Sequence, residues 1–354
     1  MDKLKVGIIG VSGYGGGELA RLLLQHPNVE LAYVTSGTYA GQPLAAALPG
    51  TAGRTGLTCE KFDPAAAADR CDFLFLAGEN GLAMKVAPLL LEAGKKVVDL
   101  SADFRLKDPA AYKEWYKAEH AAPHLLGEAV YGLPEVYRAK ITSARLVANP
   151  GCYPTSASLA VAPLLFGEFV ERDAIIVDSM SGVSGAGRSK FGLDYHFSEV
   201  NESARPYGVG GVHRHTPEIE QVFSFVASRP VAVTFTPHLI PVTRGILTTA
   251  YVGLTPDQAK GWDLEGIAEE YVSYYGYAPF VTVLEPGQQP ATKHVNGTNY
   301  CHIGLAVDKR TNRVIVTSVI DNLVKGAAGQ AIQNMNLMYG FDETAGLTMA
   351  AVWP

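Results

Sequence analysis

Short apolar runs alternate with helical patterns through the first 150 residues of the chain. A continuous run of about four to eight apolar residues between turn residues is typical of a buried strand. The runs that fit are Lys5–Ile9, Val29–Val34, Asp72–Ala77, Lys96–Ser101 and Leu146–Ala148, and the helical patterns span Leu19–Leu24 and Leu82–Ala93. This alternation predicts a Rossmann-type, doubly wound parallel sheet, because each parallel strand needs a crossover helix to return.

Strands dominate the second half. Strand patterns cover Ala174–Met180, Val231–Thr236, Ile246–Val252, Val281–Leu284, His302–Val307 and Arg313–Val319, with helical patterns over Glu265–Tyr275 and Ala327–Met338. We expect an α+β domain with a mostly antiparallel sheet and helices on one face. A length of 354 residues also suits two domains better than one.

The amino-acid composition narrows the class of protein. With 47% hydrophobic and 18% charged residues, the chain can build ordinary globular cores. A net charge of −6 gives no electrostatic basis for binding nucleic acid or an anionic membrane. No signal peptide or membrane-spanning run is visible, so we expect a cytoplasmic protein. Its four cysteines form no CxxC pair, so neither a metal site nor a disulfide framework is expected.

A glycine-rich turn follows the first strand and precedes the first helix. In this arrangement backbone N–H groups and a helix N-terminus can bind a pyrophosphate, although the spacing is GxxGxxG instead of GxGxxG. The predicted cofactor-binding residues are Gly10, Ser12, Gly13, Tyr14, Gly15 and Gly16. Thr35 and Ser36 end the next strand where an NAD enzyme usually has an acid, so NADP is favoured over NAD. The alternative is that both hydroxyls only terminate the strand.

The stretch from Asn149 to Thr155 carries the strongest chemical signal. Cys152 follows Pro150 and Gly151 and precedes an apolar, helix-compatible run. A thiol at a helix N-terminus has a lowered pKa, and the thiolate is the nucleophile. Cys152 is therefore the predicted covalent catalyst, although free cysteines are more often buried, inert residues.

A second serine–glycine loop lies at 181–188 and is followed by Lys190. Its hydroxyl and backbone donors suit a phosphate, or it is a solvated crossover loop. Ser181, Gly182, Ser184 and Gly185 are predicted to bind the cofactor. Arg105, which follows a strand at the ligand-binding edge of the first sheet, is a predicted anion ligand, with a surface ion pair as the alternative.

Two histidines precede a predicted helix start. Thr216 is the expected N-cap, with Pro217 in the first helical position. His213 and His215 flank Arg214, and a histidine in this position can act as a general base for a nucleophile. We expect one of the two histidines to form an imidazolium paired with the Cys152 thiolate.

Several motifs together resemble one known family, the N-acetyl-gamma-glutamyl-phosphate reductases, NADP-dependent enzymes of arginine biosynthesis. The motifs occur in the family's order over essentially the whole chain: GVSGYGGGEL, DLSADFRL, YGLPE, NPGCYPT, SGVSGAGR, FSEVNESARPYGV, GVHRHTPEIEQ, PHLIPVTRGIL and IDNLVKGAAGQAIQNMN. Two departures are Ser156, where the family usually has Gly or Ala, and residues 77–80, where it more often has Leu-Pro-His-Gly.

The resemblance implies a reaction and roles for individual residues. Cys152 would attack an acyl phosphate, NADPH would reduce the resulting thioester, and His213, with His215 as second choice, would manage protons. Asn322, after the last strand, would lie near the nicotinamide. The substrate-binding residues expected are Arg105, Arg214, His215, Asn149, Tyr153 and Glu218, with Arg188 and Arg244 as weaker anion ligands. The resemblance also implies a homodimer or homotetramer.

The expected domain ranges are 1–150 for the cofactor, 151–320 for catalysis and dimerisation, and 321–354 for a C-terminal helix that returns to the first domain. The nearest alternative function is reduction of the carrier-bound aminoadipyl analogue in lysine biosynthesis, which has one more methylene. A methylene is worth only about 1–3 kcal/mol of discrimination, so the sequence does not separate the two substrates. Aspartate-semialdehyde dehydrogenase shares the chemistry but should lack HRHTPEI, and a non-catalytic NADP sensor should lack an intact Cys152 with His213.

Overall fold

A computed structural model describes residues 2–167, 170–189, 192–255 and 261–352. The chain forms two compact units. The first unit contains residues 1–150, 187–189 and 327–349, and the second contains residues 151–186, 190–326 and 350–354. The functional domain ranges expected from the sequence remain predictions. Lys190, which follows the serine–glycine loop, lies outside the described residues.

A parallel sheet forms the centre of the first unit, as predicted. Within the described residues its strand order is β2-β1-β3-β4-β6-β5, and every neighbouring pair is parallel. The strands are β1 (Leu4–Ile9), β2 (Val29–Thr35), β3 (Phe73–Leu76), β4 (Lys96–Asp99), β5 (Val130–Tyr131) and β6 (Leu146–Ala148). Their apolar residues are buried on both faces, as expected for strands covered by crossover helices.

Helices connect these strands and cover the sheet. They are α1 (Tyr14–Leu23), α2 (Leu44–Ala47), α3 (Pro64–Arg70), α4 (Ala83–Glu92), α5 (Pro109–Tyr116), α6 (Pro134–Thr142) and α11 (Gly329–Tyr339), with 3₁₀ turns η1 (Pro49–Thr51) and η2 (Pro123–Leu125). The C-terminal helix α11 packs against α6, α1 and β4. It begins later than predicted, because the π-helical turn η7 (Val324–Ala328) precedes it.

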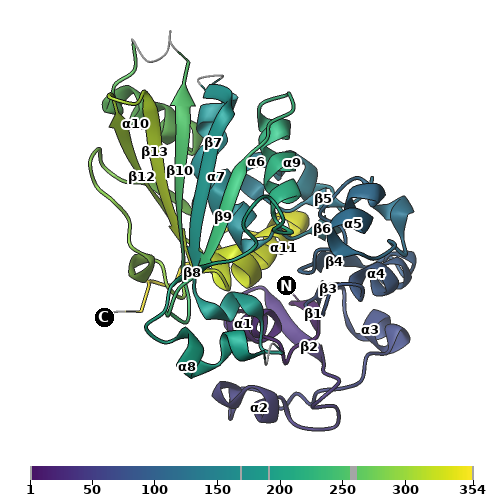
Figure 1. Ribbon diagram of the computed structural model, residues 1–354. Coiled ribbons are helices and arrows are strands. Elements are labelled where there is room, and N and C mark those ends of the chain that lie inside the picture. The colour runs from purple at the N-terminus through teal and green to yellow at the C-terminus, as the bar shows by residue number, and fades with distance from the viewer. Residues whose placement is uncertain (1, 168–169, 190–191, 256–260, 353–354) are drawn as a thin grey trace. The chain divides into compact units, whose positions relative to one another are not determined.

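A mixed sheet forms the second unit, with the order β11-β12-β13-β10-β7-β9-β8 in the described part of the chain (Figure 1). Most pairs are antiparallel, but β11–β12 and β7–β9 are parallel. The strands are β7 (Val170–Ser181), β8 (Arg205–Pro206), β9 (Thr234–Leu239), β10 (Ile246–Leu254), β11 (Val281–Val283), β12 (Cys301–Asp308) and β13 (Arg313–Ile320). Residues 231–233, predicted as strand, precede β9 and are not part of it.

Helix α7 (Cys152–Phe166) lies inside the second unit. Its residues from Tyr153 to Leu165 are all buried, and it packs against β10, β13 and α9 (Thr216–Val226). A helix that is apolar all round must be enclosed in this way. The remaining helical segments are α8 (Phe197–Val200), α10 (Leu264–Tyr274), η3 (Val183–Ala186), η4 (Leu193–Tyr195) and η6 (Thr292–His294).

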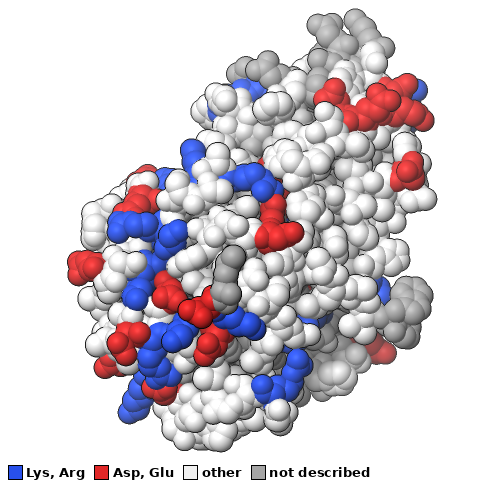
Figure 2. Space-filling view, turned by 180° about the vertical axis from the view of Figure 1, so that it is seen from behind, with Lys and Arg blue, Asp and Glu red and all other residues white. Residues whose placement is uncertain are grey.

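The surface carries charges of both signs. On the face in Figure 2, acidic and basic side chains of the described residues are interspersed, and no extended basic area forms there. In the portion of the chain that the structure describes, no helix is long and apolar enough to cross a membrane.

Candidate active site

Cys152 is the first residue of α7, which confirms the predicted location at a helix start. Gly151 precedes it in an extended conformation (φ −67°, ψ 154°) and offers no capping side chain. The first N–H groups of a helix have no partner within the helix and carry partial positive charge, which favours a thiolate at this point. Cys152 is partly exposed, whereas Cys59, Cys71 and Cys301 are buried. Burial raises the pKa of Cys71 to about 12 and also raises the pKa of Cys59.

Glu218 holds the turn before the cysteine. Its Oε1 accepts a hydrogen bond from the Gly151 N–H at 2.7 Å, and its side chain is only 1% exposed. The carboxylate comes from the first turn of α9. Glu218 was predicted to bind substrate, and the structure shows a different contact, with the backbone that presents Cys152.

Gly326, in the turn η7, lies close to Cys152. A Cβ atom built on Gly326 would lie 2.7 Å from Cys152 Cβ and 3.2 Å from its Cα. Real Cβ atoms essentially never approach so closely, so only glycine fits here without displacing the cysteine. Sequence reasoning did not select Gly326, because nothing in its local pattern indicates a contact with a residue so far away in the chain.

A cluster of rings surrounds His213. Its ring centroid lies 5.0 Å from that of His215, 5.7 Å from Tyr153, 5.3 Å from Tyr207 and 5.5 Å from Phe235, all in edge-to-face arrangements. Tyr207 was not among the predicted site residues. Its hydroxyl donates to the Tyr153 hydroxyl at 2.9 Å, and the Tyr153 hydroxyl donates to the His238 carbonyl at 3.3 Å.

The two tyrosines place Cys152 and His213 in one neighbourhood. Tyr153 follows Cys152 in α7, and its ring contacts His213. Burial raises the pKa of Tyr207, the hydrogen bond with Tyr153 lowers it, and the charge of Cys152 raises it further. The Tyr207 ring also contacts His213.

The expected imidazolium at His213 is wrong for this geometry. Burial, with a smaller contribution from the charge of the adjacent Arg214, lowers the pKa of His213 to about 4. The loss of hydration disfavours the charged form, so the imidazole is neutral at physiological pH. The Nδ1 atom accepts the His215 N–H at 3.1 Å, which fixes the ring.

Thr216 does not cap α9. The helix begins at Thr216 itself, and His215 is the residue at the cap position. The buried Thr216 Oγ1 makes no hydrogen bond within the described residues. Arg214 is exposed, between two histidines that are partly buried.

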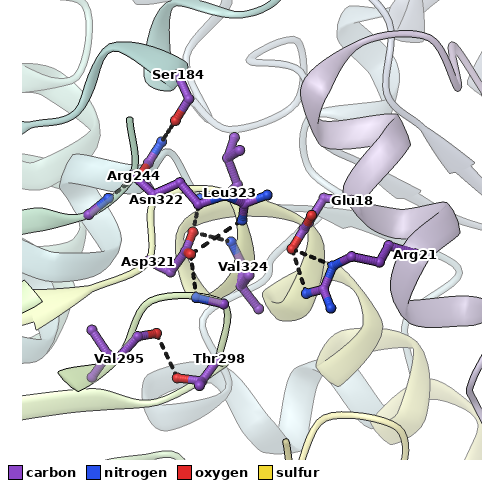
Figure 3. Close-up of polar contacts among 12 residues, drawn as sticks. Glu18, Arg21, Ser184, Arg244, Val295, Thr298, Asp321, Asn322, Leu323 and Val324 are labelled. Atoms are coloured by element: carbon purple, nitrogen blue, oxygen red, sulfur yellow. Dashed lines mark hydrogen bonds and ion pairs between the residues drawn. The ribbon is translucent and has the colours of Figure 1, made fainter. Parts of the chain in front are cut away.

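Asp321 and Asn322 join three loops of the second unit, as Figure 3 shows. Asn322 donates from Nδ2 to Ser184 Oγ at 2.9 Å and accepts from the Gly245 N–H at 2.8 Å. Asp321 is fully buried and accepts from the N–H groups of Leu323 and Val324, and its Oδ2 lies 3.3 Å from Arg244 Nη1.

Four predicted cofactor residues therefore lie at the end of β7 and in the loop after it, and Asn322 is hydrogen-bonded to that loop. Ser181, Gly182, Ser184 and Gly185 belong to or follow the end of β7. A Cβ on Gly182 would lie 2.7 Å from the Thr243 carbonyl, so this backbone approach requires glycine. The loop is rigidly tied to Asn322 through Ser184.

The glycine turn of the first unit fits a pyrophosphate. Gly10 has φ +94°, and a Cβ there would meet the Ala77 carbonyl oxygen at 2.8 Å. On Gly16 a Cβ would lie 2.3 Å from the Gly10 carbonyl oxygen. Around Gly13 and Gly15, by contrast, the nearest described atoms begin at 3.8 Å. Helix α1 starts with no side-chain cap, so its first N–H groups have no side-chain acceptor, and such groups suit an anion.

Side chains at the end of β2 lie against this turn. The Gly10 N–H donates to Thr35 Oγ1 at 3.2 Å, and Ser36 Oγ donates to Ser12 Oγ at 2.9 Å. Both Thr35 and Ser36 are buried. The predicted residues Ser12, Thr35 and Ser36 are thus brought together, and Tyr14, the first residue of α1, is exposed.

The turn at residues 77–80 is held by the motif after β4. Asn80 Oδ1 accepts the Ala102 N–H at 3.0 Å, and the Asp103 carboxylate accepts the Gly81 N–H at 2.8 Å and the Tyr112 hydroxyl at 2.8 Å. This departure from the family pattern therefore has its own hydrogen bonds. Burial, followed by the charge of Asp103, raises the pKa of nearby Asp99 to about 7.

Arg105 is mostly buried and bonds to backbone. Its Nε donates to the Asn149 carbonyl at 2.8 Å and its Nη2 to the Leu100 carbonyl at 2.9 Å. Asn149 donates from Nδ2 to the Ala327 carbonyl and accepts from Asn334. Both residues belong to the first unit, where they brace the chain before the Cys152 turn.

Comparison with known proteins agrees with this architecture. Residues 5–144 match the model of a semialdehyde dehydrogenase NAD binding domain, and residues 152–322 match a semialdehyde dehydrogenase dimerisation domain. N-acetyl-gamma-glutamyl-phosphate reductase from Symbiobacterium thermophilum is 53% identical over 99% of both chains. The protein of the same name from Moorella thermoacetica is 51% identical over 99% of this chain and 100% of its own.

The chain belongs to the N-acetyl-gamma-glutamyl-phosphate reductase family. Solved structures share the fold at low identity. Aspartate semialdehyde dehydrogenase II from Vibrio cholerae is 19% identical with a TM-score of 0.72 over 96% of this chain and 99% of its own. The Candida albicans aspartate semialdehyde dehydrogenase, solved with NADP, is 17% identical with a TM-score of 0.69 over the same shares.

The other departure from the reductase family pattern, Ser156, is also accommodated. Ser156 is fully buried in α7, and its Oγ lies 2.7 Å from Ser318 Oγ. Ser318 Oγ in turn contacts the Ser156 carbonyl at 3.0 Å. The extra hydroxyl is therefore hydrogen-bonded, and a polar group buried in this way need not destabilise the core.

Proposed function

We propose that the protein reduces N-acetyl-L-glutamyl 5-phosphate to the 5-semialdehyde, with release of phosphate, in arginine biosynthesis. The observation that carries this proposal is Cys152. It is partly exposed at the start of a buried helix, the Glu218 carboxylate holds the turn before it, and the ring of the next residue, Tyr153, contacts that of His213. The family relatives' printed name supplies the substrate.

Cys152 forms and releases the covalent intermediate. Its thiolate attacks the acyl carbon, the bond from that carbon to the phosphate oxygen breaks, and inorganic phosphate leaves with the electron pair. NADPH, when bound, supplies the hydride that reduces the thioester carbon. The resulting thiohemiacetal collapses with cleavage of its carbon–sulfur bond, which returns the thiolate and releases the aldehyde.

His213 handles the proton in this scheme. Its Nδ1 accepts the His215 N–H, so the neutral ring carries its proton on Nε2. The Nε2–H donates to the thiohemiacetal oxygen as it forms, and Nε2 takes the proton back when the carbon–sulfur bond breaks. The positive end of α7 favours the thiolate form of Cys152. Arg105, Arg214 and His215 are proposed to bind the substrate's anionic groups, with Asn149 and Tyr153 shaping the pocket.

The cofactor is proposed to be NADP, bound at two places. In the first unit the pyrophosphate lies on the Gly10–Gly16 turn, and Ser36 supplies a hydroxyl, with no acid, near the adenosine ribose. In the second unit Asn322 and the 181–185 loop lie near the nicotinamide. The dimerisation-domain match supports a homodimer or homotetramer.

The test is the reverse reaction. Phosphate-dependent reduction of NADP by N-acetylglutamate semialdehyde should proceed, and the rate should fall to background when phosphate is omitted. The aminoadipate semialdehyde analogue is measured beside it. A higher kcat/KM with the aminoadipate analogue would replace the proposed substrate, and turnover without phosphate would refute the acyl phosphate step.

A further inference from the structure

Arg188 lies against the cofactor turn of the first unit. Its Nη1 donates to the Ser12 carbonyl at 3.1 Å and to the Ala47 carbonyl at 2.9 Å. Sequence reasoning had placed Arg188 among the weaker ligands of the substrate anion, next to the 181–185 loop. The structure groups residues 187–189 with the first unit, where the guanidinium lies against the Gly10–Gly16 turn.

The positive charge of Arg188 has no counter-charge among the described residues. Its contacts are two carbonyls and the Tyr39 hydroxyl, 3.4 Å from Nη2. By contrast, two other arginines of this unit are paired with carboxylates: Arg21 with Glu18, as Figure 3 shows, and Arg70 with Glu60. The carbonyls use both protons of Nη1, so the Nε–Nη2 edge of Arg188 retains donors for an external anion, and a guanidinium edge binds phosphate bidentately.

The groups next to this edge are hydroxyls, not acids. Ser36 Oγ donates to Ser12 Oγ at 2.9 Å and accepts the Tyr39 N–H at 3.2 Å. The Arg188 guanidinium carbon lies 5.8 Å from the centroid of the Tyr39 ring. Ser12, Ser36, Tyr39 and Arg188 are therefore one connected group at the carboxyl end of β2, the position that faces the adenosine ribose in this class of fold.

We propose that Arg188 is the residue that selects the 2′-phosphorylated cofactor, by binding the adenosine 2′-phosphate with its Nε–Nη2 edge. This proposal rests on the dinucleotide site proposed above. The two carbonyls hold the guanidinium in place before the cofactor arrives, so little side-chain entropy is lost on binding. Ser36 supports the arrangement through Ser12, but it carries no charge and contributes less.

Binding of free cofactor to the purified full-length protein tests this directly. Dissociation constants for NADPH and NADH are measured by nucleotide fluorescence, without substrate. Arg188→Gln removes a charge-assisted pair, so its Kd for NADPH should rise about 10- to 100-fold while its Kd for NADH changes less than about 2-fold. Arg188→Lys, which keeps the charge but not the fork, should give an intermediate loss.

Two controls make the result decisive. Arg145→Gln removes an arginine that is paired with Glu128, and it should leave both constants unchanged. Unchanged NADH affinity shows that the Arg188 variants are folded, and if Arg188→Gln does not fold, Arg188→Lys carries the comparison. The fragments 2′,5′-ADP and 5′-AMP are titrated in parallel, and only 2′,5′-ADP should lose affinity.

The outcomes separate the two proposals. If the wild-type protein prefers NADH, the NADP assignment itself fails, and the role of Arg188 fails with it. If the wild type prefers NADPH but the Arg188 variants keep the same NADPH to NADH ratio, only the role of Arg188 is overturned. An equal loss of both nucleotides would likewise contradict selection and would make Arg188 a structural residue of the turn.

Discussion

The helices α1 and α7 begin in the same backbone conformation. Gly13 (φ −72°, ψ 165°) precedes α1 and Gly151 (φ −67°, ψ 154°) precedes α7, and neither helix has a side-chain cap. Their surroundings differ. A Cβ built on Gly13 would have its nearest neighbours at 3.8 Å, an ordinary contact distance, whereas the Gly151 N–H is taken by Glu218 and a Cβ on Gly326 would lie 2.7 Å from Cys152 Cβ.

The comparison shows what a helix N-terminus does and does not decide. Its partial positive charge favours an anion in both places. The neighbouring residues decide whether that anion is a ligand's phosphate, for which space must be left, or the chain's own thiolate, which must be held. Substitutions at the start of α7 and among its neighbours should therefore change turnover, alkylation of Cys152 and stability.

The largest expected effect comes from removing the sulfur. Cys152→Ser should lower turnover by at least about 10⁴-fold, because a serine hydroxyl at this site is not ionised. NADPH binding, which depends on α1, should be unchanged. Iodoacetamide should label Cys152 faster than the three buried cysteines, and mass spectrometry after brief labelling checks this. Near-normal turnover in the serine variant would rule out the covalent mechanism.

The second largest loss of turnover should come from removing the His213 imidazole. His213→Asn should reduce kcat by about 10²–10⁴-fold, and His215→Asn should reduce it less. Since His213 is neutral with a pKa of about 4, its acid limb in the pH profile of wild-type kcat/KM should lie near pH 4. A limb near pH 6.5 that disappears in His213→Asn would show that the imidazole is hydrated and not buried as the structure has it. A larger loss in His215→Asn would exchange the two roles.

Crowding the cysteine should have a smaller effect. Gly326→Ala places a methyl group 2.7 Å from Cys152 Cβ, so the thiol must move. A displacement of about 1 Å at a reacting atom can cost up to about 10²-fold, and we expect a 10- to 100-fold loss of kcat and slower alkylation of Cys152. Gly127→Ala, where no described atom lies within 4 Å, is the matched control and should change neither. Equal rates in both variants would show that the contact is not needed for positioning.

Stability should depend on pH through His213. The imidazole pKa is about 4 in the folded protein and 6.5 in the unfolded chain, so between these values the unfolded state binds more protons. The contribution is therefore fully present above pH 6.5 and is lost as pH falls toward 4, by on the order of a few kcal/mol. Urea unfolding of wild type and His213→Asn at pH 7.5 and pH 5 measures it. The difference between the two proteins should narrow at pH 5, and a constant difference would contradict the burial of the ring.

The smallest expected effect is a loss of stability when the Gly151 N–H loses its hydrogen-bond acceptor. Glu218→Ala removes its acceptor and should destabilise the protein by about 1–3 kcal/mol, because a buried donor loses its partner. Glu218→Gln keeps an amide oxygen at the same place and should recover most of that stability. Thermal unfolding of the two variants makes the comparison. If Gln is as damaging as Ala, the negative charge, and not the hydrogen bond, stabilises the turn.

Local patterns were enough to predict most elements and the two helix starts. The strands β1, β2, β3, β4 and β6 and the helices α1 and α4 follow from apolar runs bounded by turn residues, because these signals depend on near neighbours in the chain. The same holds for Cys152, whose turn is encoded in the adjacent Pro150 and Gly151. The π-helical turn before α11 and the late start of β9 were missed, because both depend on residues packed from elsewhere.

What only the tertiary structure decided is the environment of each chemical group. The sequence offered His213 as a charged partner, but its protonation depends on burial among Tyr153, Tyr207 and Phe235, which lie far apart in the chain. The sequence grouped Arg188 with the 181–188 loop as a weaker anion ligand. In the folded protein its guanidinium donates to the Ser12 carbonyl. Hydrogen bonding and loss of hydration act over a few ångströms in space, and the order of residues along a chain does not specify those distances.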